Sequence, residues 1–335
     1  MKQPLKSEYR RYVGIDVAKD TSVVAVHDDD IQPFKFSHDA SGFKQLRRTL
    51  ESDSIPPSEI LVVMEATGTY SLPVARFLTR AGYDVVSLNP IVARNHIKSM
   101  LVQDKTDHID ALHLAEIAMH VRGKLFLWQE PSQVYEELRQ RLDLRDALAD
   151  VKAKQLNRQH AAEKRLRVDD VDTQRKEIIA YVDSKIKSLE KEMKSILLSD
   201  PEWGQNARFL LSIPGFGIYI VTALIVRTLN FTVIENADQL AAYVGVVPRK
   251  WESGDTGYRY IRFSSVPRLR HALYMCTFSA VRFNPVVRDY YNRLVARGKS
   301  RQKTRIACIR KLLHIAFGCV RNQTMFDSEY AAKTF

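Results

Sequence analysis

The sequence predicts an α/β amino-terminal region followed by an all-α remainder. Three observations lead to this prediction. Strand-like and helix-like segments alternate over residues 1–130, residues 132–200 contain neither Gly nor Pro amid dense mixed charge, and residues 201–335 have mainly helical patterns. Because 335 residues exceed the roughly 250–300 at which single hydrophobic cores usually divide, we expect three domains, at residues 1–130, 131–200 and 201–335.

The first 130 residues show strand and helix signals in turn. Runs of β-branched and apolar residues predict strands at 12–15, 22–26, 60–64 and 84–88. The first two flank a short turn and therefore predict a hairpin. Apolar periodicity predicts helices at 72–81, closed by Gly82, and at 109–121. Strands joined by crossover helices predict a mixed sheet covered by helices.

Residues 131–200 predict a helical hairpin with coiled-coil character. Its second half carries apolar residues at spacings of 3, 4, 3, 4 and 3, namely Ile179, Val182, Ile186, Leu189, Met193 and Ile196. A weaker stripe precedes it, at Leu138, Leu142, Ala149 and Leu156. The spacing leaves two uses open, because such a seam either packs within one chain or joins subunits.

Residues 209–226 form an uncharged run of eighteen residues, within the roughly 17–25 that span a membrane. Pro214, Gly215 and Gly217 interrupt it, which leaves a helix too short to span, so we expect no membrane association. A helix, a Pro-Gly-Phe-Gly turn and a second helix predict a helix-hairpin-helix, whose glycines let backbone N–H groups approach a phosphate. A tight turn between two core helices remains the alternative. Residues 244–260 predict a loop region punctuated by Gly and Pro.

The net charge of +12 is confined to one part of the chain. Residues 1–130 carry a net charge of −1, residues 131–200 carry +1, and residues 201–335 carry +12, with Arg providing 15 of their 20 cations. Guanidinium groups fork onto phosphate oxygens, so this composition favours a nucleic-acid partner over a merely solvated basic face. The three Cys residues are odd in number and lack metal-ligand spacing, which fits a reducing cytoplasm and argues against structural zinc.

Four carboxylates lie where catalytic carboxylates are needed. Asp16 ends the first predicted strand, Glu65 ends the strand at 60–64, and Asp107 and Asp110 share one face at the start of a helix. Hard oxygen ligands suit Mg²⁺ or Mn²⁺. Two such ions would stabilise the attacking and leaving oxygens of a phosphodiester. Each carboxylate taken alone is more often a turn or cap residue.

A second candidate centre is Ser253, in a polar loop next to Gly254. A plain turn is the commoner reading of such a pair, but cations surround this one. They are Arg249, Lys250, Arg259, Arg262, Arg268 and Arg270. Guanidinium groups beside a Ser hydroxyl would stabilise a pentacoordinate phosphoryl transition state.

Short motifs in order along the chain resemble the Asp-Glu-Asp-Asp transposases of the insertion sequence 110 family. They are Tyr-Val-Gly-Ile-Asp-Val-Ala-Lys at 12–19, Met-Glu-Ala-Thr-Gly at 64–68, Lys-Thr-Asp-His-Ile-Asp-Ala at 105–111, Ile-Pro-Gly-Phe-Gly at 213–217, Gly-Val-Val-Pro at 245–248 and Glu-Ser-Gly at 252–254. Leu-Arg-His-Ala-Leu-Tyr-Met at 269–275 is similar to the branch typified by insertion sequence 1111. Pilin-gene invertases share the pattern.

The resemblance implies an RNase H-like, RuvC-type first domain, a helical linker, and a transposase domain with a Ser nucleophile. Asp16, Glu65, Asp107 and Asp110 would hold the metal and Ser253 would attack DNA. It also implies donor and target DNA as substrates, a non-coding guide RNA as partner, and a nucleoid-associated cytoplasmic enzyme. Because recombination holds two duplexes together, we expect a homodimer or homotetramer. A pilin-type invertase, a RuvC-like nuclease using water, and a non-catalytic nucleic-acid-binding protein remain alternatives.

Overall fold

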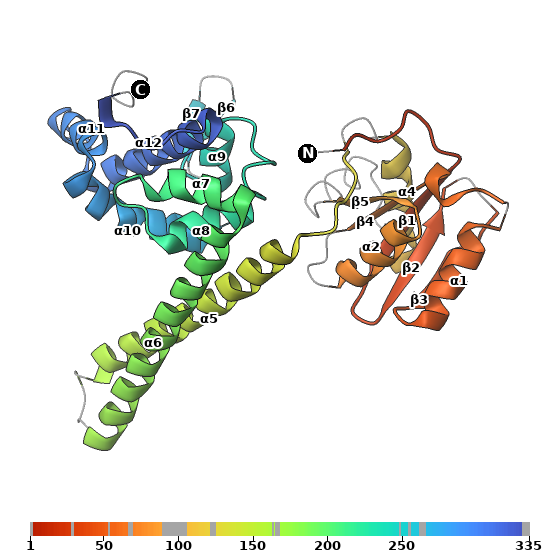
Figure 1. Ribbon diagram of the computed structural model, residues 1–335, viewed down its shortest axis with the longest axis horizontal. Helices are drawn as coiled ribbons and strands as arrows, with labels where there is room; N and C mark the ends of the chain where they lie inside the picture. Colours follow the sequence, from red (N-terminus) through yellow and green to blue (C-terminus); the bar gives the residue numbers. More distant parts are fainter. Residues whose placement is uncertain are drawn as a thin grey trace. The chain divides into compact units, whose positions relative to one another are not determined.

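The chain folds into two compact units, residues 1–130 and 131–335 (Figure 1). The computed structural model describes residues 3–27, 30–52, 54–65, 70–88, 106–120, 125–162, 164, 168–247, 249–253, 256–260 and 266–329. For the strands at 249–253 and 256–260 it describes the backbone alone. The helical hairpin and the basic last third belong to the same unit.

A five-stranded mixed sheet forms the first unit, with strand order β3-β2-β1-β4-β5. The strands are β1 (Arg11–Val17), β2 (Thr21–Val26), β3 (Phe34–Ser37), β4 (Ile60–Glu65) and β5 (Asp84–Leu88). The β1–β2 and β2–β3 pairs are antiparallel, whereas the β1–β4 and β4–β5 pairs are parallel. The hairpin, the two later strands and the mixed sheet that the sequence predicts are confirmed.

Helices cover both faces of this sheet (Figure 1). They are α1 (Ala40–Leu50), α2 (Ser71–Arg80) and α4 (Asp107–His120), with a 3₁₀ turn, η1 (Pro57–Glu59). Side chains alternate along β1, so Val13 and Ile15 pack with Leu46 of α1 and Leu78 of α2. The opposite face is covered by α4.

Gly14 sets how closely α4 approaches the sheet. A Cβ atom at this position would lie 1.9 Å from the carbonyl oxygen of Ala111 and 2.5 Å from the backbone nitrogen of Ala115. No side chain fits there without moving the helix. The glycine of the Val-Gly-Ile-Asp segment therefore lets α4 lie directly on β1.

The second unit is an antiparallel helical hairpin, one end of which packs on a bundle of shorter helices (Figure 1). The hairpin is α5 (Gln133–Ala162) and α6 (Asp169–Ser199). The shorter helices are α7 (Pro201–Leu211), α8 (Ile218–Arg227), α9 (Ala237–Val244), α10 (Pro267–Phe283), α11 (Pro285–Ala296) and α12 (Arg301–Asn322). The mostly helical remainder that the sequence predicts is confirmed. Within the described residues, no helix has the length and apolarity needed to cross a membrane.

The apolar seam of α6 packs within the chain. Val182, Ile186, Leu189 and Met193 are buried, and α5 is the helix that α6 packs on along its length. Ion pairs flank the seam, such as Arg145 Nη2 to Glu190 Oε1 at 3.0 Å. Of the two uses that the spacing leaves open, the structure assigns these residues to internal packing.

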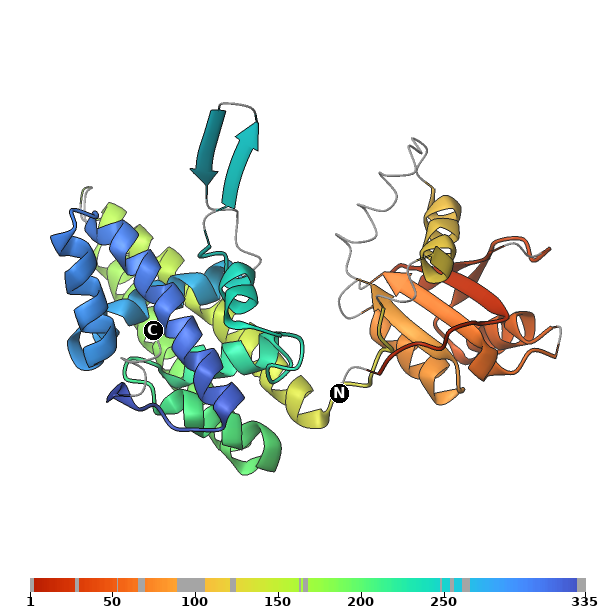
Figure 2. The ribbon, with the colours of Figure 1, turned by 90° about the horizontal axis from the view of Figure 1, so that it is seen from above.

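Residues 244–260 differ from the loop that the sequence predicts. Backbone pairing forms an antiparallel hairpin of β6 (Arg249–Ser253) and β7 (Thr256–Tyr260), which projects from the helical body (Figure 2). Trp251 and Tyr258 occupy directly opposed positions in its register. Aromatic residues favour strands, and they outweigh the Gly and Pro signals here.

Candidate active site

Asp16 is the next-to-last residue of β1, and Glu65 is the last residue of the neighbouring parallel strand β4. The register pairs Ile15 of β1 with Met64 of β4, so each carboxylate lies one residue beyond this pair. Parallel strands present their carboxyl ends at the same edge of a sheet. Asp16 and Glu65 are therefore adjacent at that edge, and both are half-buried.

The two carboxylates also share one face of the sheet. Asp16 alternates with buried Ile15 and so lies on the side of Gly14, against which α4 packs. Glu65 is two residues after Val63, whose side chain packs with Leu114 of α4. Both carboxylates are thus on the face that α4 covers.

The amino-terminal half of α4 lies beside Asp16. Ala111 packs against Val23 and Ala25 of β2. Val23 is the residue directly opposite Asp16 in the β1–β2 register. The start of α4 is therefore near the carboxyl end of β1.

The other end of α4 fixes its direction. The ring of His120 lies 6.3 Å from that of His27, and the backbone N–H of His27 donates to the carbonyl of Tyr12, at the start of β1. The helix consequently runs antiparallel to β1, and its first turn, with Asp107 and Asp110, lies toward the edge that carries Asp16. Asp107 is exposed and Asp110 is half-buried.

All four predicted carboxylates thus belong to one edge of one sheet face. The donor set fits a hard divalent cation, because four carboxylates provide only oxygen ligands. Within the described ranges, no three His, Cys, Asp or Glu side chains stand at metal-binding distance from one another. Residues 66–69 and 89–105, which follow Glu65 and precede α4, lie outside the described part of the chain.

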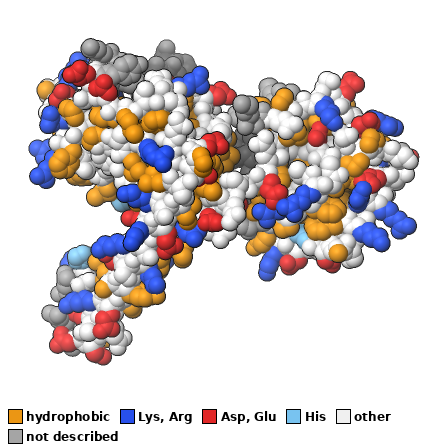
Figure 3. Space-filling view, viewed as in Figure 1, with side chains coloured by type: hydrophobic (Ala, Val, Ile, Leu, Met, Phe, Trp, Pro, Cys, Tyr) orange, Lys and Arg blue, Asp and Glu red, His pale blue; other side chains and the backbone are white. Residues whose placement is uncertain are grey.

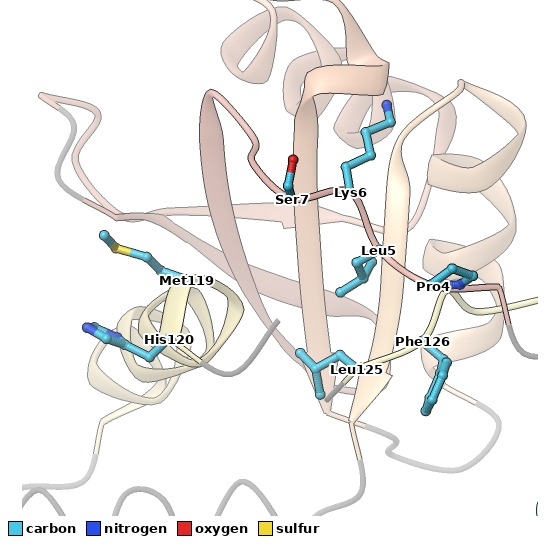
Figure 4. Close-up of a pocket in the computed structure, with 8 residues that line it drawn as sticks. All are labelled: Pro4, Leu5, Lys6, Ser7, Met119, His120, Leu125 and Phe126. Atoms are coloured by element: carbon cyan, nitrogen blue, oxygen red, sulfur yellow. The ribbon is translucent and has the colours of Figure 1, made fainter. Parts of the chain in front are cut away.

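A hollow of about 690 Å³ opens elsewhere on the first unit (Figure 4). Its lining is Pro4, Leu5, Lys6, Ser7, Met119, His120, Leu125 and Phe126. Met119 and His120 end α4, whereas Asp107 begins it. Since an α-helix rises about 1.5 Å per residue, the hollow is separate from the carboxylate edge.

Ser253 is the last residue of β6, beside the tip of the projecting hairpin. It pairs with Thr256 in the register, so only Gly254 and Asp255 connect the strands, and both lie outside the described residues. The hairpin carries Arg249 and Lys250 on one strand and Arg259 on the other. Lys250 and Arg259 occupy directly opposed positions.

The remaining predicted cations have different positions. Arg262 lies outside the described residues. Arg270 is half-buried in α10. Arg268, also on α10, forms an ion pair with Asp150 of α5, and this pairing raises the pKa of the guanidinium above its usual value. Arg268 therefore has a structural contact that the sequence does not reveal.

Gly215 and Gly217 face different surroundings in the turn between α7 and α8. Gly215 has φ of +105°, and a Cβ there would lie 3.0 Å from the Cβ of Ala280 on α10. Its carbonyl accepts a hydrogen bond from the thiol of Cys276. Gly217 is exposed, begins α8 without a side-chain cap, and has no atom near its notional Cβ. Gly215 thus serves the tight turn, whereas Gly217 leaves the positive end of a helix open.

Asp146 is a buried charge that the sequence analysis missed. It is 1% exposed on α5 and accepts a hydrogen bond of 2.8 Å from the Tyr219 hydroxyl of α8. Arg227 of α8 and Arg268 of α10 approach its Oδ2 atom at 3.7 and 3.8 Å. Burial and the Asp146 contact raise the pKa of Tyr219 well above its usual value. The available signal was its place on the apolar stripe of α5, four residues after Leu142 and three before Ala149.

Comparison with known proteins assigns the family. A family model described as a transposase, of the Asp-Glu-Asp-Asp class of insertion sequence 110, matches residues 13–167. A second, described as "Transposase IS116/IS110/IS902 family", matches residues 207–292. The chain belongs to the insertion sequence 110 family of transposases. The predicted resemblance is confirmed, and this transposase is an enzyme of DNA recombination that acts on DNA.

Individual relatives of this transposase include invertases. The chain is 28% identical to the "pilin gene-inverting protein" of Moraxella bovis over 323 residues, which is 95% of this chain and 98% of the relative. The protein of the same name from Moraxella lacunata shows the same identity and coverage. An uncharacterised insertion element IS110 protein of Streptomyces coelicolor is 27% identical over 151 residues, which is 44% of this chain and 35% of the relative.

Proposed function

We propose that this transposase cuts and rejoins DNA through a Ser253 nucleophile and a metal-binding carboxylate cluster, guided by a non-coding RNA. The observation that carries the proposal is the arrangement of the first unit. Strand register and helix direction bring Asp16, Glu65, Asp107 and Asp110 to one edge of the sheet. The mixed sheet, three antiparallel strands extended by two parallel ones, supports an RNase H-like, RuvC-type assignment.

The chemistry is a pair of transesterifications. The Ser253 hydroxyl attacks a DNA phosphorus, the ester bond to one deoxyribose oxygen breaks, and the Ser proton passes to that oxygen. A deoxyribose hydroxyl then attacks the resulting phosphoserine, which restores a phosphodiester and returns the proton to Ser253. Mg²⁺ or Mn²⁺ held by the four carboxylates would offset charge on the attacking and leaving oxygens. Energy is conserved in the covalent bond, so no ATP is consumed.

Each half of the proposal has its own variant. Ser253→Ala is expected to abolish strand cleavage and the covalent protein–DNA adduct together while leaving DNA binding intact. Asp16→Asn is expected to abolish cleavage by weakening metal binding. Thr256→Val is the matched control, because it removes a hydroxyl at the position directly opposite Ser253. Denaturing gels after incubation with end-labelled DNA and Mg²⁺ measure cleavage and adduct.

One outcome would replace the mechanism. A RuvC-like nuclease uses water as its nucleophile. If this protein were such a nuclease, the Ser253→Ala variant would cleave DNA at the normal rate and leave free DNA ends. Metal-dependent cleavage at the wild-type rate by this variant would contradict the Ser mechanism.

DNA inversion is the second candidate outcome of the same chemistry. The pilin gene-inverting relatives cover 95% of the chain, which favours it. A plasmid with two inverted copies of the recombination site distinguishes the two. Inversion of the intervening segment indicates an invertase, whereas excision or insertion indicates transposition.

The guide RNA is supported by the net charge of +12 of residues 201–335 and by the family resemblance. Purified protein is expected to carry RNA whose affinity falls steeply with salt. Sequence-specific activity after complete ribonuclease treatment would contradict this part of the proposal.

A further inference from the structure

The last three helices of the described chain concentrate positive charge. Residues 266–322, which include α10, α11 and α12, contain 13 Lys and Arg, one Asp and no Glu, a net charge of +12. In Figure 3, blue Lys and Arg side chains lie beside orange hydrophobic ones on the visible face of the second unit, to which these helices belong. A surface with so few carboxylates attracts polyanions.

One side of α10 leaves a stripe of large side chains in solvent. His271, Met275, Phe278 and Arg282 recur at spacings of 4, 3 and 4 and are all exposed. Met275 is 53% and Phe278 49% exposed. The opposite side of the helix, with Leu273, is buried in the core. Because about half of the Met275 and Phe278 surface stays exposed, the stripe is open to a ligand.

Arg305 of α12 packs against the aromatic rings of α10 and α11. Its guanidinium carbon lies 3.5 Å from the ring centroid of Phe278 and 5.4 Å from that of Tyr291 on α11. Arg305 Nη1 also donates to Thr277 Oγ1 at 3.3 Å, and Tyr274 meets the Phe278 ring edge-on at 6.0 Å. Cation–π contacts of this kind fix both the charge and the rings. Three helices thus hold aromatic planes and a guanidinium plane together.

We propose that this aromatic–arginine face, made of Met275, Phe278, Arg282, Tyr291 and Arg305, binds single-stranded nucleic acid. Bases stack on the exposed part of the Phe278 ring, and phosphates lie beside the two arginines. In a duplex, both faces of each base are covered by its neighbours, so an exposed ring finds no base to stack on. The inference rests on the proposed function, since it specifies the strand state of the nucleic-acid partner.

Charge argues against a second copy of the chain as the occupant. Both copies would bring the same strongly positive helices to the interface, and α10 to α12 contain one carboxylate, Asp289, to offset them. A single strand instead provides phosphates for the cations and bases for the rings. The face therefore complements a single strand in both respects.

The test compares binding of the full-length protein to a fluorescein-labelled DNA single strand and to a labelled duplex of the same sequence. Binding is measured by the fluorescence anisotropy of the labelled DNA over a range of NaCl concentrations. Phe278→Ala is expected to weaken single-strand binding about tenfold, because it removes a stacking platform. Duplex binding and the salt dependence should stay unchanged, because no cation is removed. Phe278→Tyr, which keeps the ring, should bind as wild type. So should Leu144→Ala, at a 52% exposed apolar position on α5.

Three results would overturn the inference. In the first, Phe278→Ala binds the single strand as tightly as wild type does. In the second, the substitution weakens single-strand and duplex binding equally. In the third, light scattering gives a lower mass for Phe278→Ala than for wild type, which would mark the face as a protein interface. Binding is measured without cleavage, so absence of a Ser253 adduct would refute the proposed chemistry alone. A Phe278→Ala protein that forms the adduct and binds the single strand normally would refute this inference alone.

Discussion

At the scale of single residues, two glycines of one turn have separate tasks. Gly215 has φ of +105°, and a Cβ at this position would lie 3.0 Å from the Cβ of Ala280 on α10. Gly217 is exposed to solvent just before the first turn of α8. Because no side chain caps α8 at Gly217, the N–H groups of its first turn are open to a phosphate. The helix-hairpin-helix prediction therefore depends on Gly217, and Gly215 serves packing.

The contrast predicts different effects of the same substitution. Gly215→Ala should lower the free energy of unfolding by about 1–3 kcal/mol, because the new Cβ meets Ala280 and the backbone is strained. Gly217→Ala should change stability by less than about 0.5 kcal/mol but weaken duplex binding if the open helix end contacts a phosphate. Urea denaturation and anisotropy measure the two effects. Equal stability of both variants would contradict the packing role of Gly215.

The candidate carboxylates were predictable because their positions follow from local rules. Asp16 and Glu65 directly follow buried apolar runs, which places them at strand ends. Asp146 was not predictable in the same way. Its place on the α5 stripe indicates burial, but its partners Tyr219, Arg227 and Arg268 belong to helices far along the sequence, which the local pattern does not identify.

At the scale of elements, Asp146 joins three helices. From α5 it contacts Tyr219 and Arg227 of α8 and Arg268 of α10. Arg268 is the second residue of α10, which follows β7, the second strand of the hairpin that carries Ser253. The buried carboxylate thus fixes the base of α10 to the long helical hairpin.

Removing this carboxylate leaves the buried hydroxyl of Tyr219 without its acceptor. Asp146→Ala should cost about 1–3 kcal/mol, because a buried donor that loses its partner keeps its desolvation penalty. Asp150→Ala removes a half-exposed partner of the same Arg268 and should cost less than about 1 kcal/mol. Thermal unfolding followed by circular dichroism gives the comparison. A loss of the same size for both variants would contradict the burial argument.

Elements were predicted well where their pattern is periodic and poorly where it is not. The strands of the first unit and the long helices follow clear periods of two and of about 3.6 residues. The β6–β7 hairpin was expected as a loop, because Gly245 and Pro248 precede it and the strands are five residues each. Its pairing depends on register across the turn, which short strands specify weakly.

At the scale of the whole molecule, charge and assembly follow from the second unit. The net charge of +12 is carried by the last third of the chain, whereas residues 1–130 carry −1. Recombination needs two duplexes held together, so we retain the homodimer or homotetramer as a proposal. The apolar seam of α6 packs on α5 of the same chain. The contact between subunits would therefore use another surface.

The internal seam makes a specific prediction. Ile186→Glu with Leu189→Glu buries two charges at positions 8% and 9% exposed, so thermal stability should fall, at a cost on the order of 3 kcal/mol or more. Ile178→Glu, at a 43% exposed position of the same helix, should have little effect. Light scattering below the unfolding transition should show the mass of wild type for all variants. A stable double variant of halved mass would instead show that the seam joins subunits.

The central claim is that Ser253 becomes covalently bound to DNA, and mass spectrometry of the trapped adduct tests it most directly. Protein is incubated with Mg²⁺ and DNA, denatured, digested with protease and nuclease, and the nucleotide-bearing peptide is sequenced. The account predicts one modified peptide, with the nucleotide on Ser253, in wild type and none in Ser253→Ala. A nucleotide on another residue, or cleaved DNA with no modified peptide, would contradict it.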